Sequence, residues 1–188
     1  MTLPIDLTPD DWTYSEYARL PDDGNRYEVL DGEVLVTPAP GTLHQKVILR
    51  LAIALLEYVD GRGVGWVFQD VDLLFRTGQF LRPDLLVVPR EGREGITDRG
   101  VEVAPVLVVE VLSPSSGRID RVKKPRRYLD FGVPEYWVVD HRRAAIWRWT
   151  QTTGPDAPEA VQGTLRWALP EGAEPLEIDV DTLVAPIG

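Results

Sequence analysis

The feature that most restricts the fold of this chain is a glutamate, Glu110, inside the apolar run at residues 106–112. A near-continuous apolar run of this kind is typical of a strand that is buried on both faces of a sheet. A bare carboxylate in such a strand costs several kcal/mol unless it is paired, protonated or bound to a cation. The sequence therefore predicts a buried central strand, and it leaves two explanations for Glu110: a buried Arg or Lys partner, or a functional site.

The segments on either side of this strand predict a mixed α/β fold. Apolar residues spaced three and four apart predict a helix that begins near Thr42, and a second helix is predicted over residues 119–131. Asp31 and Gly32 form a strong turn signal, which predicts a hairpin over residues 26–38. The other predicted strands are residues 66–75 and 80–88, joined through Thr77 and Gly78, and residues 135–140 and 144–150.

Shorter segments at the two ends complete the expected architecture. Thr8 is a plausible N-cap for a helix over residues 8–20, and strand character in residues 165–169 and 176–180 predicts strands that close one edge of the sheet. The expected fold class is α/β or α+β, with a mixed sheet flanked by helices and an extra N-terminal hairpin. We expect one domain over residues 1–188, with a core at about 26–150 and C-terminal strands over 160–188.

Composition restricts the kinds of site that the chain can build. The chain has no Cys, and its two histidines are His44 and His141. A metal would therefore be held mainly by carboxylates, which favours Mg²⁺ or Mn²⁺. The net charge of −10 argues against broad, sequence-independent binding of nucleic acid. No apolar run reaches the roughly 20 residues that span a bilayer, and the N-terminus lacks signal-peptide features, so we expect a cytoplasmic protein with no membrane span.

Asp84 is the second acidic residue in an informative position. It follows Pro83 and opens the apolar segment at residues 85–88, and an Asp that only marks the turn into a strand is common. Together with Glu110 it gains meaning, because two carboxylates on neighbouring core strands can converge on one divalent cation. Such a cation lowers the pKa of bound water and neutralises charge that grows on a phosphate in transfer. A nearby Lys can then orient the attacking water or stabilise the transition state.

A basic segment follows the predicted central strand. From Arg118 to Arg127 there are six basic residues and one acidic residue, Asp120. Such a run indicates either a solvated helix face or a local patch that contacts backbone phosphates of DNA. The arginines proposed for phosphate contact are Arg118, Arg121, Arg126 and Arg127.

Several motifs occur in a fixed order over roughly residues 12–150. They are Tyr27 to Glu33 (YEVLDGE), Pro38-Ala39-Pro40 with His44, Arg82-Pro83-Asp84, residues 110–116 (EVLSPSS), the trio Asp120, Lys124 and Tyr128, and residues 132–140 (GVPEYWVVD). In order and spacing this set resembles the Uma family of restriction endonuclease-like proteins, within the PD-(D/E)XK nuclease superfamily.

The resemblance implies a restriction endonuclease-like core and a set of site residues. It matches Asp84 and Glu110 to the metal-binding acidic pair, adds Val111 to the metal site, and implies Glu28 as a further acid near the metal. The superfamily has a Lys two residues after the second acid, where this chain has Leu112. The catalytic residues that the resemblance implies are Asp84, Glu110, Lys124 and Glu28.

Two of these assignments stay open on the residues alone. Asp120, Lys124 and Tyr128 are four residues apart and would share one helix face, but Pro125 disfavours helical geometry at Lys124, so Lys123 is an alternative for the lysine role. A histidine at a helix start can face solvent or assist at the site. The candidates for DNA-binding or accessory roles are His44, Arg118, Arg121, Lys123, Arg126, Arg127 and Tyr128.

Three functions fit these observations. The leading one is a metal-dependent endonuclease that hydrolyses DNA. The displaced Lys and the acidic net charge favour a second, a non-catalytic binding module with a nuclease-like fold, and the third is a metal-dependent hydrolase of a smaller phosphorylated substrate. A homodimer is expected from the symmetry of duplex DNA and the frequency of two-fold dimers, not from any particular residue.

Overall fold

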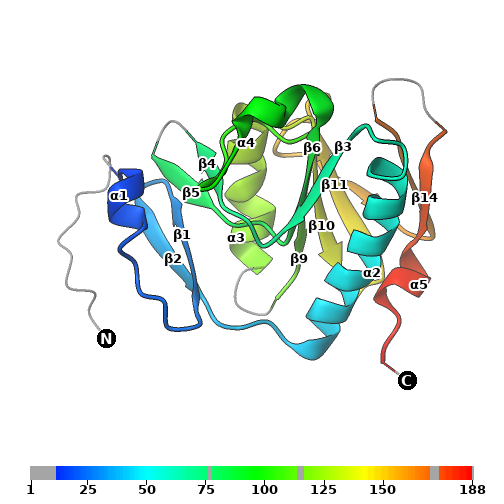
Figure 1. Ribbon diagram of the computed structural model, residues 1–188. Coiled ribbons are helices and arrows are strands. Elements are labelled where there is room, and N and C mark those ends of the chain that lie inside the picture. Colours follow the sequence, from blue (N-terminus) through cyan, green and yellow to red (C-terminus); the bar gives the residue numbers. More distant parts are fainter. Residues whose placement is uncertain (1–11, 76–77, 114–116, 170–173, 188) are drawn as a thin grey trace.

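The computed structural model describes residues 12–75, 78–113, 117–169 and 174–187, which form mixed sheets flanked by helices (Figure 1). The sheet that carries Glu110, called the central sheet here, has the strand order β12-β11-β10-β9-β6-β3. Only β9 and β10 are parallel neighbours in it; the other pairs are antiparallel. Its strands are β3 (Gly65–Gln69), β6 (Leu85–Pro89), β9 (Leu107–Val111), β10 (Glu135–Asp140), β11 (Ala145–Thr150) and β12 (Glu159–Val161).

A second sheet, called the N-terminal sheet here, contains the expected hairpin and has the order β2-β1-β5-β4-β8-β7. The hairpin turns through Asp31 and Gly32, both at positive φ, which suits the tight two-residue turn that the sequence predicts. The strands are β1 (Arg26–Leu30), β2 (Glu33–Thr37), β4 (Leu73–Phe75), β5 (Gln79–Leu81), β7 (Ile96–Thr97) and β8 (Gly100–Val101).

Helices cover both faces of the central sheet (Figure 1). The long helix α2 packs its buried residues against one face, and α4 packs against the other. Among the helices in the described residues, none has the length and apolar character needed to cross a membrane. The helices are α1 (Tyr14–Tyr17), α2 (Thr42–Val59), α3 (Gly117–Val122), α4 (Lys124–Asp130), α5 (Val180–Val184) and the 3₁₀ helix η1 (Arg90–Gly95).

The predicted central strand is confirmed. Every residue of β9 is buried, and the strand lies between β6 and β10. Leu107, Val109 and Val111 join the apolar cluster under α2, whereas Val108 joins the cluster under α4. Because side chains alternate along a strand, Glu110 points to the α4 side.

Two segments that were each predicted as one continuous strand are both interrupted in the structure, and the interruptions help to form the site. Residues 66–75 divide into β3 and β4, and residues 80–88 divide into β5 and β6, so that one long hairpin contributes to both sheets. The breaks lie opposite each other, at Asp70, which has φ 53°, and at Pro83, which cannot donate a ladder hydrogen bond. The chain therefore opens between the two sheets at Asp84, the residue before β6.

Other boundaries also differ from the prediction. The helix over residues 119–131 is two helices, α3 and α4, because Pro125 removes a backbone donor near their junction. The first helix is only α1, with Thr13 as its N-cap, and Thr8 lies outside the described residues. The C-terminal strands β13 (Thr164–Trp167) and β14 (Leu176–Asp179) pair with each other rather than closing an edge of the central sheet.

Candidate active site

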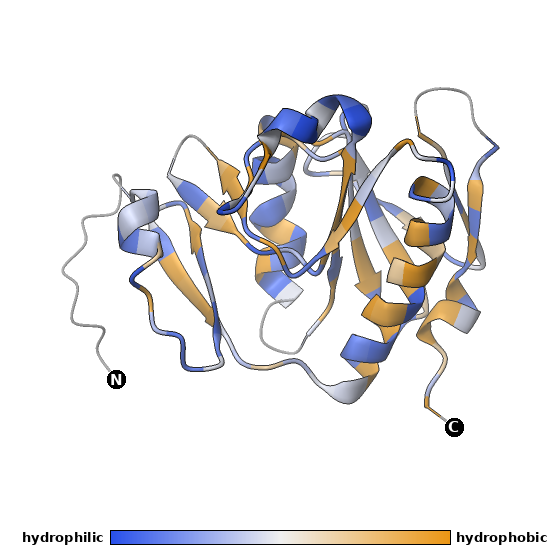
Figure 2. Ribbon diagram, viewed as in Figure 1, coloured by the Kyte–Doolittle hydropathy of each residue, from blue (hydrophilic) through white to orange (hydrophobic). Residues whose placement is uncertain are grey.

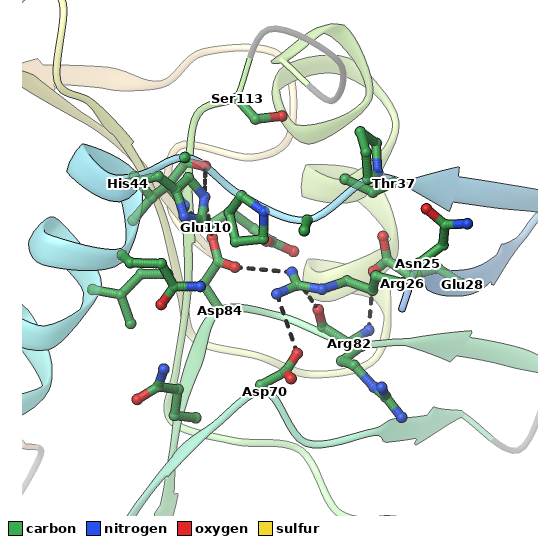
Figure 3. A pocket seen from close by; sticks show the side chains of 18 of the residues that line it. Asn25, Arg26, Glu28, Thr37, His44, Asp70, Arg82, Asp84, Glu110 and Ser113 are labelled. Carbon is green, nitrogen blue, oxygen red and sulfur yellow. Dashed lines mark hydrogen bonds and ion pairs between the residues drawn. The ribbon is translucent and has the colours of Figure 1, made fainter. Parts of the chain in front are cut away.

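The opening between the two sheets leads to a pocket of about 490 Å³. Asp84, which directly precedes β6, and Glu110 of β9 line it. Leu85 of β6 pairs with Val109 of β9, and this pairing brings the two acids together. The linker between β2 and α2, residues 38–41, forms one wall. Figure 3 shows the charged side chains of both sheets and of α2 converging on this space.

Asp84 is almost fully buried and accepts three polar contacts. The Val111 amide donates to its Oδ2 at 2.7 Å, Arg26 Nη1 donates to its Oδ1 at 2.8 Å, and His44 Nε2 lies 3.3 Å from Oδ2. Burial alone would raise the pKa of this carboxyl, but the contact with His44, the charge of Arg26 and the Val111 amide outweigh burial and lower the pKa. Asp84 is therefore held as a carboxylate.

Lys124, which is 2% exposed, is surrounded by carboxylates. Its Nζ lies 2.8 Å from Glu110 Oε1, 2.9 and 3.0 Å from the two oxygens of Glu28, and 3.4 Å from Asp120 Oδ1. Burial alone would lower the pKa of the ammonium, but the charges of Glu110, Glu28 and Asp120 raise it well above its ordinary value. The raised pKa favours the ammonium form of Lys124 at neutral pH, which suits a fixed cation better than a general base.

The pKa of Glu110 is also raised, but here burial is the main cause. Burial raises its pKa well above the ordinary value; Lys124 opposes that rise, while repulsion by Asp120, Asp84 and Glu28 adds to it. Tyr128 has a strongly raised pKa from burial and from the charge of Glu110, so its hydroxyl stays protonated and donates to Glu110 Oε1 at 3.1 Å.

The buried charges of the pocket do not balance. Among the described residues, four buried carboxyl groups share two cations, Lys124 and Arg26. Ionisation of all four with a neutral His44 would leave a deficit of two positive charges, and the raised pKa of Glu110 reflects this excess of acidic groups. One divalent cation would correct such a deficit, since buried charges are normally paired or bound to a metal. We call the four carboxylates the acid cluster; its members are Glu28, Asp84, Glu110 and Asp120.

The donor atoms near Asp84 fit a hard divalent cation. His44 Nε2 lies 2.8 Å from the Val111 carbonyl oxygen and 3.3 Å from Asp84 Oδ2, so these two oxygens face the same imidazole nitrogen and a cation bound to both would replace His44 there. Carboxylate and carbonyl oxygens are the ligands that Mg²⁺ prefers, usually one or two carboxylates with water completing the shell. In the described part of the chain, no group of three or more His, Asp or Glu side chains is placed to hold a metal ion.

Comparison with known proteins identifies the family and a similar fold. The model of the Uma2 family, described as "Putative restriction endonuclease", matches residues 14–181. The chain belongs to the Uma2 family. Its fold is similar to the crystal structure of a putative nuclease from Anabaena variabilis, with a TM-score of 0.74 and 16% sequence identity, over 91% of this chain and 96% of that one. No curated protein matches the chain in sequence.

The structure of this Uma2 protein brings together seven of the residues singled out from the sequence. They come from β1, α2, β6, β9 and α4, which are far apart in the chain and meet at the pocket or in the shell around it. Of the two candidate lysines, Lys124 lies in the acid cluster, whereas Lys123 is exposed and pairs with Glu33 at 2.8 Å. The seven residues are Glu28, His44, Asp84, Glu110, Val111, Lys124 and Tyr128.

The remaining basic candidates lie outside the pocket. Arg127 pairs with Asp31 in the hairpin turn at 2.6 Å, and Arg126 lies 3.5 Å from Asp156. Arg121 donates to the backbone carbonyl of Gly117, and Arg118 is exposed. Like Lys123, Arg127 ties the helical segment to the hairpin. Contact of these residues with DNA stays a prediction.

Arg26 is the site residue that sequence reasoning missed. Its guanidinium bridges Asp84 at 2.8 Å and Asp70 at 3.1 Å, and Figure 3 shows it between these two carboxylates. A signal was present in the sequence: Arg26 and Glu28 are two apart on a strand, so their side chains share a face. Asp120 was noted only as part of a motif, and its burial beside Lys124 makes it a member of the site.

Proposed function

We propose that this protein is a divalent-metal-dependent endonuclease that hydrolyses phosphodiester bonds of DNA. The observation that carries the proposal is the acid cluster, which is buried at an open pocket and is neutralised only in part by Lys124 and Arg26. Membership of a family described as restriction endonucleases supports the choice of DNA as substrate.

Asp84, Glu110 and the Val111 carbonyl would hold Mg²⁺ or Mn²⁺. When bound, the cation would lower the pKa of a water molecule and neutralise charge on the phosphate. Asp84 is suited to this role because it is kept ionised, and Glu110 would ionise fully once a cation offset its repulsion by the other acids.

Lys124 would act as a fixed cation rather than as a base. It orients Glu110 and Glu28, and Glu28 is itself fixed by the backbone amide of Arg82 at 2.9 Å. Its ammonium has no further short contact beyond these carboxylates among the described residues, and a hydrogen bond from it would stabilise negative charge near Glu110. The proton of the attacking water would then pass to a carboxylate of the acid cluster or to solvent.

Arg26 would bind the substrate phosphate. Its side chain is 19% exposed and lines the pocket, whereas its partner Asp84 is the proposed metal ligand. A cation at Asp84 would compete with the guanidinium for the same carboxylate. Arg26 would then be available to a phosphate oxygen, which guanidinium groups bind well.

Plasmid cleavage tests the proposal. Wild-type protein should cleave in Mg²⁺ or Mn²⁺ but not in EDTA, and Asp84→Asn should abolish cleavage while the far-UV circular dichroism stays unchanged. Asp156→Asn is a matched control, because Asp156 is exposed and pairs with Arg126 rather than with a residue of the acid cluster. Cleavage by Asp84→Asn at the wild-type rate would exclude the proposed role of the acid pair.

One observation favours the alternative of a non-catalytic binding module. Both oxygens of Asp84 and Oε1 of Glu110 already have protein partners: Arg26 and His44 at Asp84, and Lys124 and Tyr128 at Glu110 Oε1. In that case DNA or another partner would bind equally well in EDTA and to Asp84→Asn, with no turnover of DNA or of small phosphorylated substrates such as nucleotides. Fluorescence anisotropy with labelled duplex DNA, run beside the cleavage assay, separates the two functions.

A further inference from the structure

An apolar stripe runs along the outward face of α2. The described residues contain six exposed large apolar side chains, and three of them, Leu49, Ile53 and Leu56, lie on this helix with 49%, 49% and 39% exposure. Their spacing of four and three residues places them in one row on the helix surface. We call this row the α2 stripe; Figure 2 shows that most of α2 is apolar.

The C-terminal segment lies beside α2. Arg50 Nη1 donates to the carbonyl oxygens of Leu183 at 3.0 Å and Ala185 at 2.7 Å, which holds the chain after α5 beside α2. Ile187 follows two residues later and is 58% exposed. Figure 1 shows α5 and the C-terminus next to α2. Clustering of exposed apolar side chains on one side of a protein marks an interaction surface rather than ordinary scatter.

The charges on this face are placed unfavourably with respect to the dipole of α2. Lys46 lies toward the N-terminal end of the α2 stripe, and Glu57 and Asp60 lie at its C-terminal end. A helix is stabilised by acids near its N-terminus and bases near its C-terminus, which is the opposite order. All three are exposed, and no ion pair to another described residue is formed by them. The cations Lys123, Arg126 and Arg127, by contrast, do have acidic partners.

We propose that the α2 stripe is the interface of a homodimer, in which α2 packs antiparallel against α2 of a second copy across a two-fold axis near Ile53. Lys46 and Asp60 each lie seven residues from Ile53. The two-fold axis therefore places Lys46 of each copy opposite Asp60 of the other, with the apolar stripes between these pairs. The antiparallel arrangement also sets each helix terminus beside a terminus of opposite dipole.

Charge complementarity identifies a second copy as the occupant. A two-fold interface must be complementary to itself, and a helix that is basic at one end, apolar in the middle and acidic at the other meets this condition only when it is antiparallel to itself. One helix pair with a short flanking segment is at the small end of specific interfaces, so we expect a dimer with a micromolar dissociation constant.

Sedimentation equilibrium of the full chain from micromolar to several hundred micromolar tests the interface. Wild-type protein should dimerise, and Ile53→Asp should raise the dissociation constant by about 30-fold or more, because it places two carboxylates at the centre of the interface. Val122→Asp is the matched control, since Val122 is 64% exposed but lies on α3, and it should leave dimerisation unchanged. A wild-type protein that stays monomeric, or equal effects of the two substitutions, would overturn the proposal.

Charge exchange tests the antiparallel register. Lys46→Asp and Asp60→Lys should each weaken the dimer by about three- to tenfold, because each creates two like-charge contacts per dimer. The double variant Lys46→Asp/Asp60→Lys should regain wild-type affinity, since each new Asp then faces a new Lys of the second copy. A double variant that is no tighter than the single variants would overturn the antiparallel pairing, and circular dichroism would verify that each variant is folded.

Discussion

The two faces of the central sheet differ in chemistry although the same strands build both. On the α2 side, β9 contributes Val109 to an apolar cluster. On the α4 side it contributes Glu110, which contacts Lys124 and Tyr128 in an equally buried place. Well-packed apolar residues can often replace a buried ion cluster at no loss of stability. Because the α4 side also holds an apolar cluster that includes Val108, the contrast indicates that Glu110 and its polar partners are kept for the site rather than for folding.

Removal of Lys124 should have the largest effect on stability and on DNA cleavage, and it should distinguish the acid cluster from the apolar cluster under α2. Lys124→Met leaves three buried carboxylates without their shared cation, so we expect about 3–5 kcal/mol less unfolding free energy at pH 7 and no DNA cleavage. Leu51→Ala in the apolar cluster under α2 should cost a similar amount, about 2–5 kcal/mol, but should leave the cleavage rate per folded molecule unchanged. Urea denaturation and plasmid cleavage measure both effects. A Lys124→Met protein as stable as wild type would contradict the difference between the faces.

Substitution of Arg26, which would compete with a cation for Asp84, should have a smaller effect than removal of Lys124. Arg26→Gln removes the guanidinium from Asp84, so Mn²⁺ should bind about tenfold more tightly while cleavage falls, since the phosphate ligand is lost. Arg26→Lys keeps the charge and should retain weaker Mn²⁺ binding. Isothermal titration calorimetry with Mn²⁺ gives the affinity, and unchanged binding in Arg26→Gln would show that Arg26 does not compete for the site.

The raised pKa of Glu110 predicts a pH dependence that the apolar face lacks. A carboxyl whose pKa is raised on folding contributes stability that is present below its unfolded pKa and is lost as the pH rises through its folded pKa. Glu110→Gln should therefore become more stable relative to wild type as the pH rises above about 4.5, the ordinary value for Glu. Mn²⁺ should reduce this difference by neutralising Glu110. Thermal unfolding from pH 4 to 9, with and without Mn²⁺, measures it; a constant difference would contradict the pKa shift.

The contribution of Asp84 to stability should depend on pH in the opposite direction. Its pKa is lowered on folding, so its contribution is present above the unfolded pKa and is lost as the pH falls through the lower folded pKa. Asp84→Asn should therefore lose the most stability relative to wild type at neutral pH, and the difference should shrink in acid. The same pH series measures this, and a difference that grows in acid would contradict the pKa shift.

The smallest effects are expected outside both clusters. Lys123→Ala and Arg127→Ala each remove an exposed ion pair to the hairpin, which is worth about 0–1 kcal/mol of stability. If these residues also contact DNA phosphates, each substitution should reduce the slope of log affinity against log salt by about one. Anisotropy titrations at several salt concentrations test this, and an unchanged slope would remove the residue from the DNA interface.

The site was more predictable than the path of the chain that builds it. Glu110 and Asp84 stood out because each carboxylate adjoins an apolar strand. The apolar spacing predicted α2, but its N-cap is Gly41 rather than Thr42, which is the first residue of the helix. The division of one hairpin between two sheets could not be foreseen, since it depends on a positive φ at Asp70 that is fixed by tertiary contacts. The omitted site residue, Arg26, contacts Asp84 at this division.

Lys124 shows how local and tertiary information combine. On the residues alone Pro125 left Lys123 and Lys124 both open, because proline disturbs the helix at that point. The break between α3 and α4 occurs as Pro125 suggests, but burial against Glu28, which is distant in sequence, decides which lysine enters the acid cluster. Periodicity within one helix carries no information about such a partner.

Calorimetric titration of Mn²⁺ into the folded protein tests the central claim, that the acid cluster is a divalent cation site, most directly. We predict one ion per chain for wild type and for Asp156→Asn, and no binding to Asp84→Asn at the same concentrations. Absence of Mn²⁺ binding by folded wild-type protein, or equal binding by wild type and Asp84→Asn, would contradict the claim.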